Sequence, residues 1–302
     1  MSWIAIALLS AAVISIVNIF DKTVIYRYAT SPLTLPLLIG MAQTIVGTAV
    51  ILINGIPAGV TLESSIAAII SGIFFGLSGI TSQRVLFTQE VSRTIPVTQS
   101  APIFAAFLAM MFLNEPISLL QWGGILATVS GSVMLSIRVR DVGTIFLHKS
   151  FYMLMLSAFL FGAANVIGKH ALTDLPILYT HGLRMFALGS VFLAFALRQE
   201  SWRDVRGYFV TRSPALLFVG TNEFLTANIG ILLMLWALSL GPASLVTALF
   251  GTRAFFVVLY STGLALIWRG SLGEQTSPGT IAVKILSAML IVAGIAAIAN
   301  PG

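Results

Sequence analysis

Apolar runs of membrane-spanning length recur along the whole chain. A transmembrane helix needs about 20 largely apolar residues, and ten runs approach that length. They lie at 3–21, 32–53, 63–84, 94–113, 117–137, 151–169, 176–197, 214–236, 242–267 and 280–299. The connections between them are short, so no extramembrane domain is expected. The predicted fold class is an all-α integral membrane protein with about ten transmembrane helices.

Composition and charge agree with a lipid environment. Apolar residues make up 58% of the chain, charged residues only 9%, and the mean hydropathy is +1.00, whereas a soluble domain carries about a quarter charged residues. The basic residues lie in loops rather than in patches with aromatics, so no nucleic-acid partner is expected. No cysteine is present, which excludes thiol chemistry. We expect a multi-pass protein of a cell membrane in contact with lipids, and the bacterial inner membrane is the first choice.

An internal repeat divides the chain into two halves. Asn18 and Lys22 in the first segment recur 147 positions later as Asn165 and Lys169 in the sixth, with three neighbouring identities at the same offset. Because each half holds five segments, an odd number, the second half must enter the membrane from the opposite side. Two inverted five-helix repeats are therefore expected, which place a substrate site near the midplane and permit alternating access. Their predicted bounds are 1–140 and 150–302.

The distribution of positive charge predicts an orientation. Thirteen Lys and Arg residues lie at or near the face opposite the termini, against Lys169 alone near the terminal face. Positively charged loops stay on the cytoplasmic side. The charge count therefore predicts that both termini lie outside the cell.

Two stretches of the chain carry a family-like pattern. One is Asn165-Val-Ile-Gly-Lys169 followed by Pro176 and Gly182-Leu-Arg184, and the other is Pro102 through Glu115-Pro116-Ile-Ser118 to Gly123 and Gly131. In both, the chain resembles the ten-helix type of the drug/metabolite transporter superfamily, which is made of two EamA domains. The resemblance runs over nearly the whole chain and implies a transporter. The second half departs from the pattern, because Arg253 stands where Pro102 would align. Such proteins usually have cytoplasmic termini, in conflict with the charge count, which we follow.

Three charged residues lie deep in predicted helices. At 1.5 Å per residue, Arg184, Glu223 and Arg253 are roughly 12 to 18 Å from the starts of their segments, near the centre of a ~30 Å core. A charge there costs about 2.5 to 3.5 kcal/mol on insertion scales. One interpretation is a structural ion pair between Glu223 and an arginine. The other is a substrate site, in which the guanidiniums bind an anion or Glu223 carries a coupling proton.

The repeated asparagines and lysines allow two interpretations. Lys22 and Lys169 end their helices on opposite faces, where they either extend to the headgroups or act as gates for the two open states. Asn18 and Asn165, one turn earlier, either line the pathway or join helices through hydrogen bonds.

Other polar residues in the apolar segments are candidates for the same site. His181 shares a helix face with Arg184 and is either a proton relay or a packing residue. Arg84 is a candidate gate residue or an interfacial anchor. The candidates for the polar lining are Asn222, Gln43 and Gln99. By contrast, the fifth and tenth segments carry small residues and no central charge, as expected of scaffold helices.

The sequence thus favours a secondary transporter that exports or exchanges a small polar metabolite, either an organic anion or an amino-acid-like compound. It has no Gly-rich ATP-binding loop, so a proton or substrate gradient must supply the energy. An intramembrane enzyme on a lipid-linked substrate is the alternative, but no carboxylate pair or histidine motif has catalytic or metal-ligand spacing within a helix. We therefore expect no enzymatic activity, metal or cofactor. A non-transporting scaffold and a homodimer both remain open.

Overall fold

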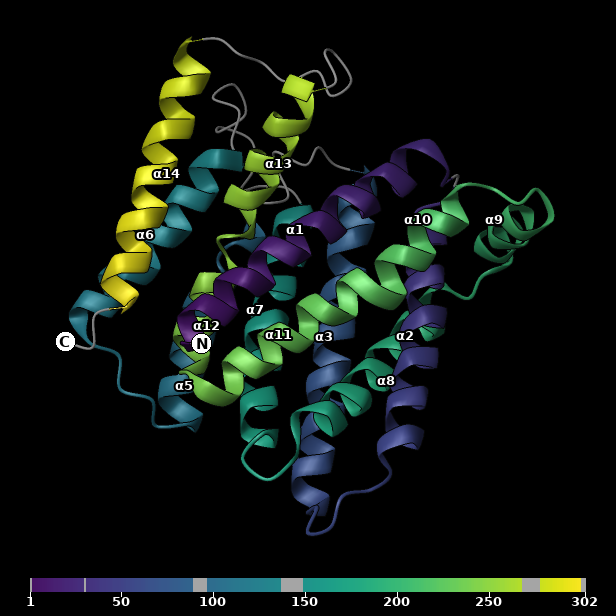
Figure 1. Ribbon diagram of the computed structural model, residues 1–302, viewed down its shortest axis with the longest axis horizontal. Coiled ribbons are helices and arrows are strands. Elements are labelled where there is room, and N and C mark those ends of the chain that lie inside the picture. The colour runs from purple at the N-terminus through teal and green to yellow at the C-terminus, as the bar shows by residue number, and fades with distance from the viewer. Residues whose placement is uncertain (1, 30, 89–96, 137–148, 268–277, 300–302) are drawn as a thin grey trace.

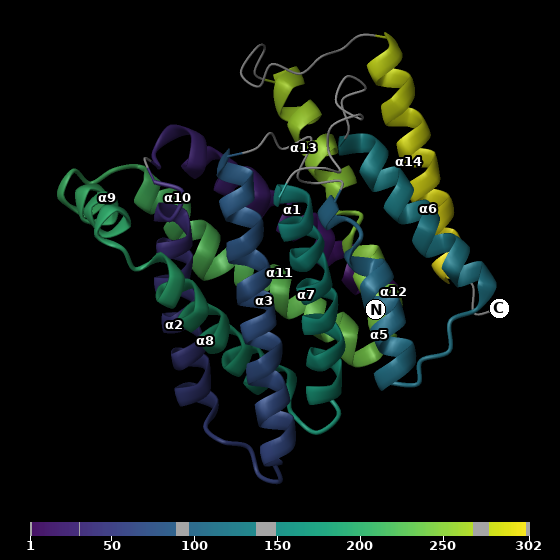
Figure 2. The same ribbon diagram turned by 180° about the vertical axis from the view of Figure 1, so that it is seen from behind.

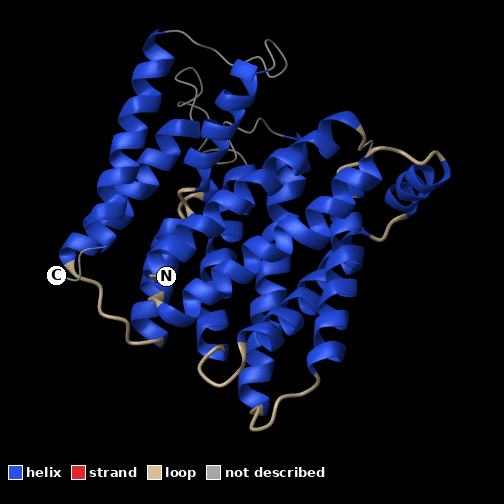
Figure 3. Ribbon diagram, viewed as in Figure 1, coloured by secondary structure: helices blue, strands red, loops and turns tan. Residues whose placement is uncertain are grey.

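The structure is a computed structural model that describes residues 2–29, 31–88, 97–136, 149–267 and 278–299. All regular elements in these ranges are helices (Figure 3). In chain order they are α1 (Trp3–Arg27), α2 (Thr34–Asn54), α3 (Leu62–Thr88), α5 (Ala101–Phe112), α6 (Leu119–Ser136), α7 (Lys149–Ala171), α8 (Ile177–Ala196), α9 (Gln199–Val210), α10 (Ala215–Thr221), the π-helical turn η2 (Asn222–Thr226), α11 (Ala227–Leu240), α12 (Ala243–Phe250), α13 (Arg253–Ile267) and α14 (Pro278–Ala299).

Seven helical stretches in the described ranges are long and apolar enough to cross a membrane. They are Trp3–Ile25, Thr34–Asn54, Leu62–Val85, Ser150–Ala171, Ile177–Ala196, Ala215–Leu240 and Ala243–Tyr260. Three shorter apolar helices are Ala101–Phe112, Leu119–Met134 and Ile285–Ala299. Each of these stretches overlaps one of the predicted segments. A multi-pass, all-helical membrane protein is therefore confirmed.

Two segment predictions need correction. α1 continues to Arg27 instead of ending at 21, because a helix can extend beyond the apolar core into the interface. The predicted segment 242–267 is not one helix, since Gly251 and Thr252 interrupt it between α12 and α13. Hydropathy did not reveal this break because apolar residues continue on both sides of it.

The helices pack in pairs that join distant parts of the chain. α2 lies along α8, α3 contacts both α7 and α8, α1 packs beside α11, and α5 packs on α7 and α12 (Figures 1 and 2). α6 and α14 pair at one side of the molecule. Their glycines allow the close approach, since a Cβ added to Gly124 would lie 2.8 Å from the Gly294 carbonyl oxygen. This pair has the packing expected of a scaffold.

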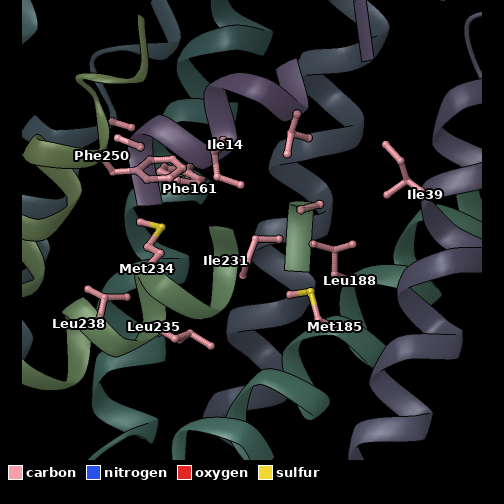
Figure 4. Close-up of a cluster of buried hydrophobic side chains, with 14 of the residues drawn as sticks. Ile14, Ile39, Phe161, Met185, Leu188, Ile231, Met234, Leu235, Leu238 and Phe250 are labelled. Carbon is pink, nitrogen blue, oxygen red and sulfur yellow. The ribbon is translucent and has the colours of Figure 1, made fainter. Parts of the chain in front are cut away.

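Apolar side chains from several helices meet in the core (Figure 4). Ile231 and Leu235 of α11 pack with Met185 of α8 and Ile14 of α1 in one buried cluster. Phe161 of α7 lies beside Phe250 of α12 on another side of the same cluster. The core therefore joins both halves of the chain around α11.

The connection between the predicted segments 176–197 and 214–236 contains the amphipathic helix α9, which apolar length alone did not predict. The Tyr208 hydroxyl donates to the Tyr28 carbonyl oxygen at 2.6 Å. Burial and the neighbouring Asp204 raise the pKa of Tyr208 to about 12, so the hydroxyl stays a donor. The Asp204 carboxylate in turn accepts from the Thr34 hydroxyl at 2.6 Å. These bonds dock α9 on the ends of α1 and α2.

Candidate functional site

The centre of the candidate site is the π-helical turn η2 between α10 and α11. Here the amide N–H of Ala227 donates to the carbonyl of Asn222, five residues earlier. Such turns occur frequently at functional sites because the extra residue redirects side chains and backbone groups. The Glu223 carbonyl accepts from Gln43 Nε2 at 3.0 Å and from Asn228 Nδ2 at 2.6 Å. Side chains from α2 and α11 therefore converge on this turn.

Two carboxyl groups meet at η2. The Asn222 side-chain amide donates from Nδ2 to Asp21 Oδ1 at 2.8 Å and to Glu223 Oε1 at 2.9 Å. The two carboxyl groups also lie within hydrogen-bonding reach of each other. Glu223 is 2% exposed, and its Oε2 accepts from Gln43 Nε2 at 3.2 Å. We call Asp21 and Glu223 the carboxyl pair; it links α1 to η2.

A chain of polar contacts runs from this pair to α8. Asn228 contacts the Glu223 carbonyl through Nδ2, and its Oδ1 lies 3.0 Å from His181 Nε2. His181 is followed one helical turn later by Arg184, which is only 1% exposed. The predicted residues Gln43, His181 and Glu223 are therefore joined in one network, with Arg184 beside it.

Arg184 has no hydrogen-bond or ion-pair partner within the described part of the chain. Its guanidinium lies over the Phe75 ring at 5.4 Å from the ring centroid. Gly168 leaves room for it, because an added Cβ would be 3.1 Å from Arg184 Nη1. The ion pair with Glu223 that the sequence left open is not formed, since the Glu223 carboxyl group contacts Gln43, Asn222 and Asp21 instead.

Phenylalanine rings connect the buried Arg184 with the partly buried Arg253. The Arg253 guanidinium lies 4.9 Å from the Phe250 ring centroid and 5.6 Å from that of Phe161. Phe161 stacks on Phe250 at 5.6 Å and meets Phe75 edge-on at 5.5 Å. Phe75, Phe161 and Phe250, which we call the aromatic column, thus have Arg184 at one end and Arg253 at the other. Ring faces attract cations, but they supply no counter-charge.

Several buried polar atoms near these residues have no hydrogen-bond partner among the residues that the structure describes. They are Gln43 Oε1, Asn165 Oδ1, His181 Nδ1, Arg184 Nε and Asn222 Oδ1. A buried polar atom without a partner costs about 1 to 3 kcal/mol, and native proteins hold few of them. Five such atoms within one set of contacting helices indicate a place where a polar ligand gains hydrogen bonds.

Lys169, a predicted gate residue, has the contacts of a helix cap. Its Nζ donates to the carbonyls of Leu238 at 2.8 Å and Gly241 at 2.7 Å, at the end of α11. The last carbonyls of a helix lack intrahelical partners and favour a cation. We therefore assign Lys169 a structural role.

Glu115, one of the residues that carry the resemblance to an EamA domain, caps the N-terminus of α12. Its Oε1 accepts from the Ala243 amide at 2.8 Å, and its Oε2 accepts from the Ser244 hydroxyl at 3.1 Å. Ala243 begins α12, and a carboxylate at a helix N-terminus satisfies its free amides. Glu115 and Lys169 thus stabilise the corner between α11 and α12.

Gln99 lies at the break between α12 and α13. Its Nε2 donates to the Gly251 carbonyl at 2.8 Å, and the Ser132 hydroxyl lies 3.3 Å from the same oxygen. An interrupted helix inside a membrane needs such donors, because lipid offers none to the freed backbone. Arg253 starts α13 directly after the break.

The remaining predicted site residues lie outside the network. Asn165 donates from Nδ2 to the Thr247 hydroxyl at 3.3 Å and so joins α7 to α12. Arg84 contacts the Phe195 carbonyl at 3.4 Å near the end of α8, as an anchor would. Asn18 is exposed on α1. The Lys22 side chain, a predicted gate, lies outside the side chains that the structure describes.

The sequence prediction missed Asp21 and Asn228. Asp21 fell at the expected end of the first segment, where a carboxylate needs no special explanation. Asn228 is five positions after Glu223, a spacing that separates residues on an α-helix but not across a π-turn. An asparagine inside an apolar segment was the available signal for Asn228.

Together these features define a multi-pass helical membrane protein with a buried polar network beside Arg184, a buried arginine without a counter-charge among the described residues. A family model described as "EamA-like transporter family" matches residues 148–299. The chain belongs to this family of the drug/metabolite transporter superfamily, whose members are transporters rather than enzymes. The match covers the second predicted repeat, and the first predicted EamA domain lies outside the matched residues.

The fold itself is shared with a solved structure. A protein described only as "Crystal structure of protein" aligns with a TM-score of 0.69 at 15% sequence identity, over 98% of this chain and 96% of that chain. At this identity the likeness concerns the fold alone. No curated protein matches the chain.

Proposed function

We propose that this protein is a secondary transporter that carries a small polar metabolite, and that Arg184 binds an anionic group of that metabolite. The single observation behind this proposal is the buried Arg184 guanidinium, which has no hydrogen bond or ion pair among the described residues. A buried cation without a counter-charge is unfavourable. A carboxylate or phosphate offsets that cost, and its geometry matches the guanidinium fork. An anionic substrate explains why the charge is kept inside the bundle.

The aromatic column refines the proposed substrate class. Phe75, Phe161 and Phe250 lie between Arg184 and Arg253, so a ligand held by either arginine also meets ring surface. This arrangement favours an organic anion with an apolar portion. Amino-acid-like compounds are the second class, because their carboxylate would use the same guanidinium.

We further propose ten membrane spans in two inverted repeats with the bounds 1–140 and 150–302. The seven long spans and three shorter apolar helices supply ten candidates. The helix pairs support the repeat. In it, α1, α2, α3, α5 and α6 of the first half correspond to α7, α8, α11, α12 and α14 of the second. The contacts follow this correspondence, because α2–α8, α5–α12 and α6–α14 pair equivalent helices, and the α3–α7 pair has its counterpart in α11–α1. Alternating access then follows from motion of one half against the other.

The charge count gives a testable orientation, with α9 in the cytoplasm and both termini outside. The natural chain has no cysteine, so a single introduced thiol reports its own side of the membrane. Ala58→Cys, between α2 and α3, should react with a membrane-impermeant maleimide on intact cells. Glu200→Cys on α9 should react only after lysis, and the reverse pattern would place the termini inside.

The transport proposal is tested with purified protein in liposomes. A panel of organic anions and amino acids is screened for thermal stabilisation, and each stabilising compound is then tested by counterflow. We expect a stabilising anion to be carried by the wild type and by the control Arg203→Gln, which changes an exposed arginine of α9, but not by Arg184→Gln. Stabilisation by anions without counterflow in the wild type would contradict transport and indicate a binding scaffold.

Direction and energy source are part of the same proposal. Export or exchange driven by a gradient is favoured because the chain has no ATP-binding loop. Counterflow in liposomes without any imposed ion gradient would support exchange. Accumulation that requires a pH gradient would support coupling to protons.

A further inference from the structure

The carboxyl pair joins the two proposed halves of the protein. Asp21 lies on α1 and Glu223 on η2, 202 positions apart in the sequence. One nitrogen atom, Asn222 Nδ2, is 2.8 Å from Asp21 Oδ1 and 2.9 Å from Glu223 Oε1. Two ionised carboxylates at such close range repel strongly, and pairs of this kind commonly share one proton.

The surroundings of the pair supply no neutralising cation among the described side chains. The helices α2, α10, α11 and α12, which pack near the pair, contain no ionisable residue. α8 contributes His181 and Arg184, which contact Asn228 and the Phe75 ring. α13 contributes Arg253, which lies on the Phe250 ring. Lys22, whose side chain is not described, follows Asp21 in the chain.

The neutral groups that touch the pair are hydrogen-bond donors. Asn222 Nδ2 faces both carboxyl groups, and Gln43 Nε2 faces Glu223. A site for a metal cation would present oxygen ligands instead. Donors directed at carboxyl oxygens suit a pair with one negative charge and one proton. The described residues also include no group of three or more metal-binding side chains.

The pair is within reach of the aqueous face that carries α9. Asp21 is only partly buried, and α1 ends six residues later at Arg27, about 9 Å further along the helix. Asn18, one turn earlier on the same helix, is exposed. A proton therefore has a short route to Asp21 from that face, whereas Glu223 is enclosed.

We propose that Asp21 and Glu223 bind one exchangeable proton between them, and that loss of this proton separates α1 from η2. With the proton present, one carboxyl group donates to the other and the Asn222 amide bridges both. Without it, two like charges face each other across the boundary between the halves. The coupling of this movement to substrate rests on the proposed transport function, whereas proton binding by the pair does not.

Proton binding is tested by infrared titration of the purified protein without any added compound. The wild type should show an infrared band of a protonated carboxyl group that disappears as the pH rises. In Asp21→Asn and in Glu223→Gln this band should disappear at a pH about one unit or more lower, because each variant removes the neighbouring negative charge. Asp21→Asn keeps the oxygen that accepts from Asn222. Glu200→Gln, an exposed carboxylate of α9, is the matched control and should leave the band unchanged. The same titration curve in all four proteins would overturn proton sharing.

The movement is tested by spin labels in the cysteine-free chain. Labels at Ile16→Cys on α1 and Leu225→Cys on η2, both exposed positions, report the separation of the two helices. We expect a longer distance at high pH than at low pH, and no change with pH when Asp21→Asn and Glu223→Gln are both present. A distance that is constant with pH in the wild type would overturn the movement.

A further arm separates protons from other cations. Exchange of sodium chloride for choline chloride at constant pH should leave the distance unchanged, and a sodium-dependent change would overturn the proton assignment. These readouts need no transported compound. Their failure would therefore leave the counterflow result intact, and failure of counterflow would leave them intact.

Discussion

Charged side chains enter the helical bundle at two places that differ in how their charges are satisfied. At the corner of α11 and α12, Lys169 donates to the Leu238 and Gly241 carbonyls, and Glu115 accepts from the first residues of α12. In the centre, the Arg184 guanidinium lies over the Phe75 ring and has no hydrogen-bond or ion-pair partner in the part of the chain that the structure describes. Both places hold charged side chains, but only those at the corner have hydrogen-bond partners among the described residues.

The difference separates structural charges from candidate functional ones. Helix ends carry backbone groups without intrahelical partners, so a charge placed there stabilises the fold. A charge left without partners costs stability, and a ligand of opposite charge is what offsets that cost. Partners, rather than depth in the membrane, are therefore the criterion by which we select charges for the proposed transport site.

The largest expected effect is that of Arg184→Leu. A hydrogen bond to a charged group contributes about 1.5 to 3 kcal/mol, so we expect counterflow at low substrate concentration to fall about 10- to 100-fold. The melting temperature should stay equal or rise, because an apolar residue replaces an uncompensated charge. Arg203→Leu on α9 is the control. A drop in melting temperature with normal counterflow would show that Arg184 is structural.

Glu115→Ala should show the opposite behaviour. It leaves the Ala243 amide and the Ser244 hydroxyl without their acceptor, and we expect the free energy of unfolding to fall by about 2 to 3 kcal/mol. Counterflow per folded molecule should remain normal. Glu115→Gln retains one acceptor oxygen and should lose less. Thermal unfolding in detergent measures both variants, and normal stability with lost transport would contradict the cap.

Lys169→Met should be milder. The variant loses two bonds to the last carbonyls of α11, which we expect to lower the free energy of unfolding by about 1 to 2 kcal/mol. Methionine keeps an apolar stem of similar length. Transport per folded molecule should be unchanged. If transport disappears while the unfolding transition is unaltered, Lys169 is a gate after all.

The smallest expected effect is that of Phe75→Leu. The cation–π contact with Arg184 contributes about 1 kcal/mol, which corresponds to a roughly fivefold weaker affinity for an anion. Titration of the stabilising anion into wild type and variant measures this. A stronger loss than that of Arg184→Leu would mean that the ring, not the guanidinium, is the main contact.

The general fold was predictable because a membrane-spanning helix has a one-dimensional signal, its apolar length. The segment 63–84, for example, matches the span Leu62–Val85 closely. Features without that signal were missed. α9 buries only one side, through residues such as Val205 and Tyr208, and its polar sequence resembles a loop. The break at Gly251 lies inside a continuous apolar run.

The candidate site was predictable in part for the same reason. Glu223, Arg184 and His181 stood out because polar groups are costly in lipid, and the structure places them in neighbouring positions. The contact between Asp21 and Glu223 was not predictable, since only the tertiary fold brings α1 to η2. The repeat match of Asn18 with Asn165 suggested equal surroundings for the two residues. In the structure Asn18 is exposed and Asn165 is buried.

The most direct test of the account is equilibrium binding of the transported anion to a matched pair of variants, Arg184→Gln and Lys169→Met, beside the wild type. The account predicts that Arg184→Gln loses at least about tenfold in affinity with an unchanged melting temperature. Lys169→Met should bind like the wild type although it melts earlier. Wild-type affinity in Arg184→Gln, or an equal loss of affinity in both variants, would contradict the assignment of the uncompensated arginine as the substrate site.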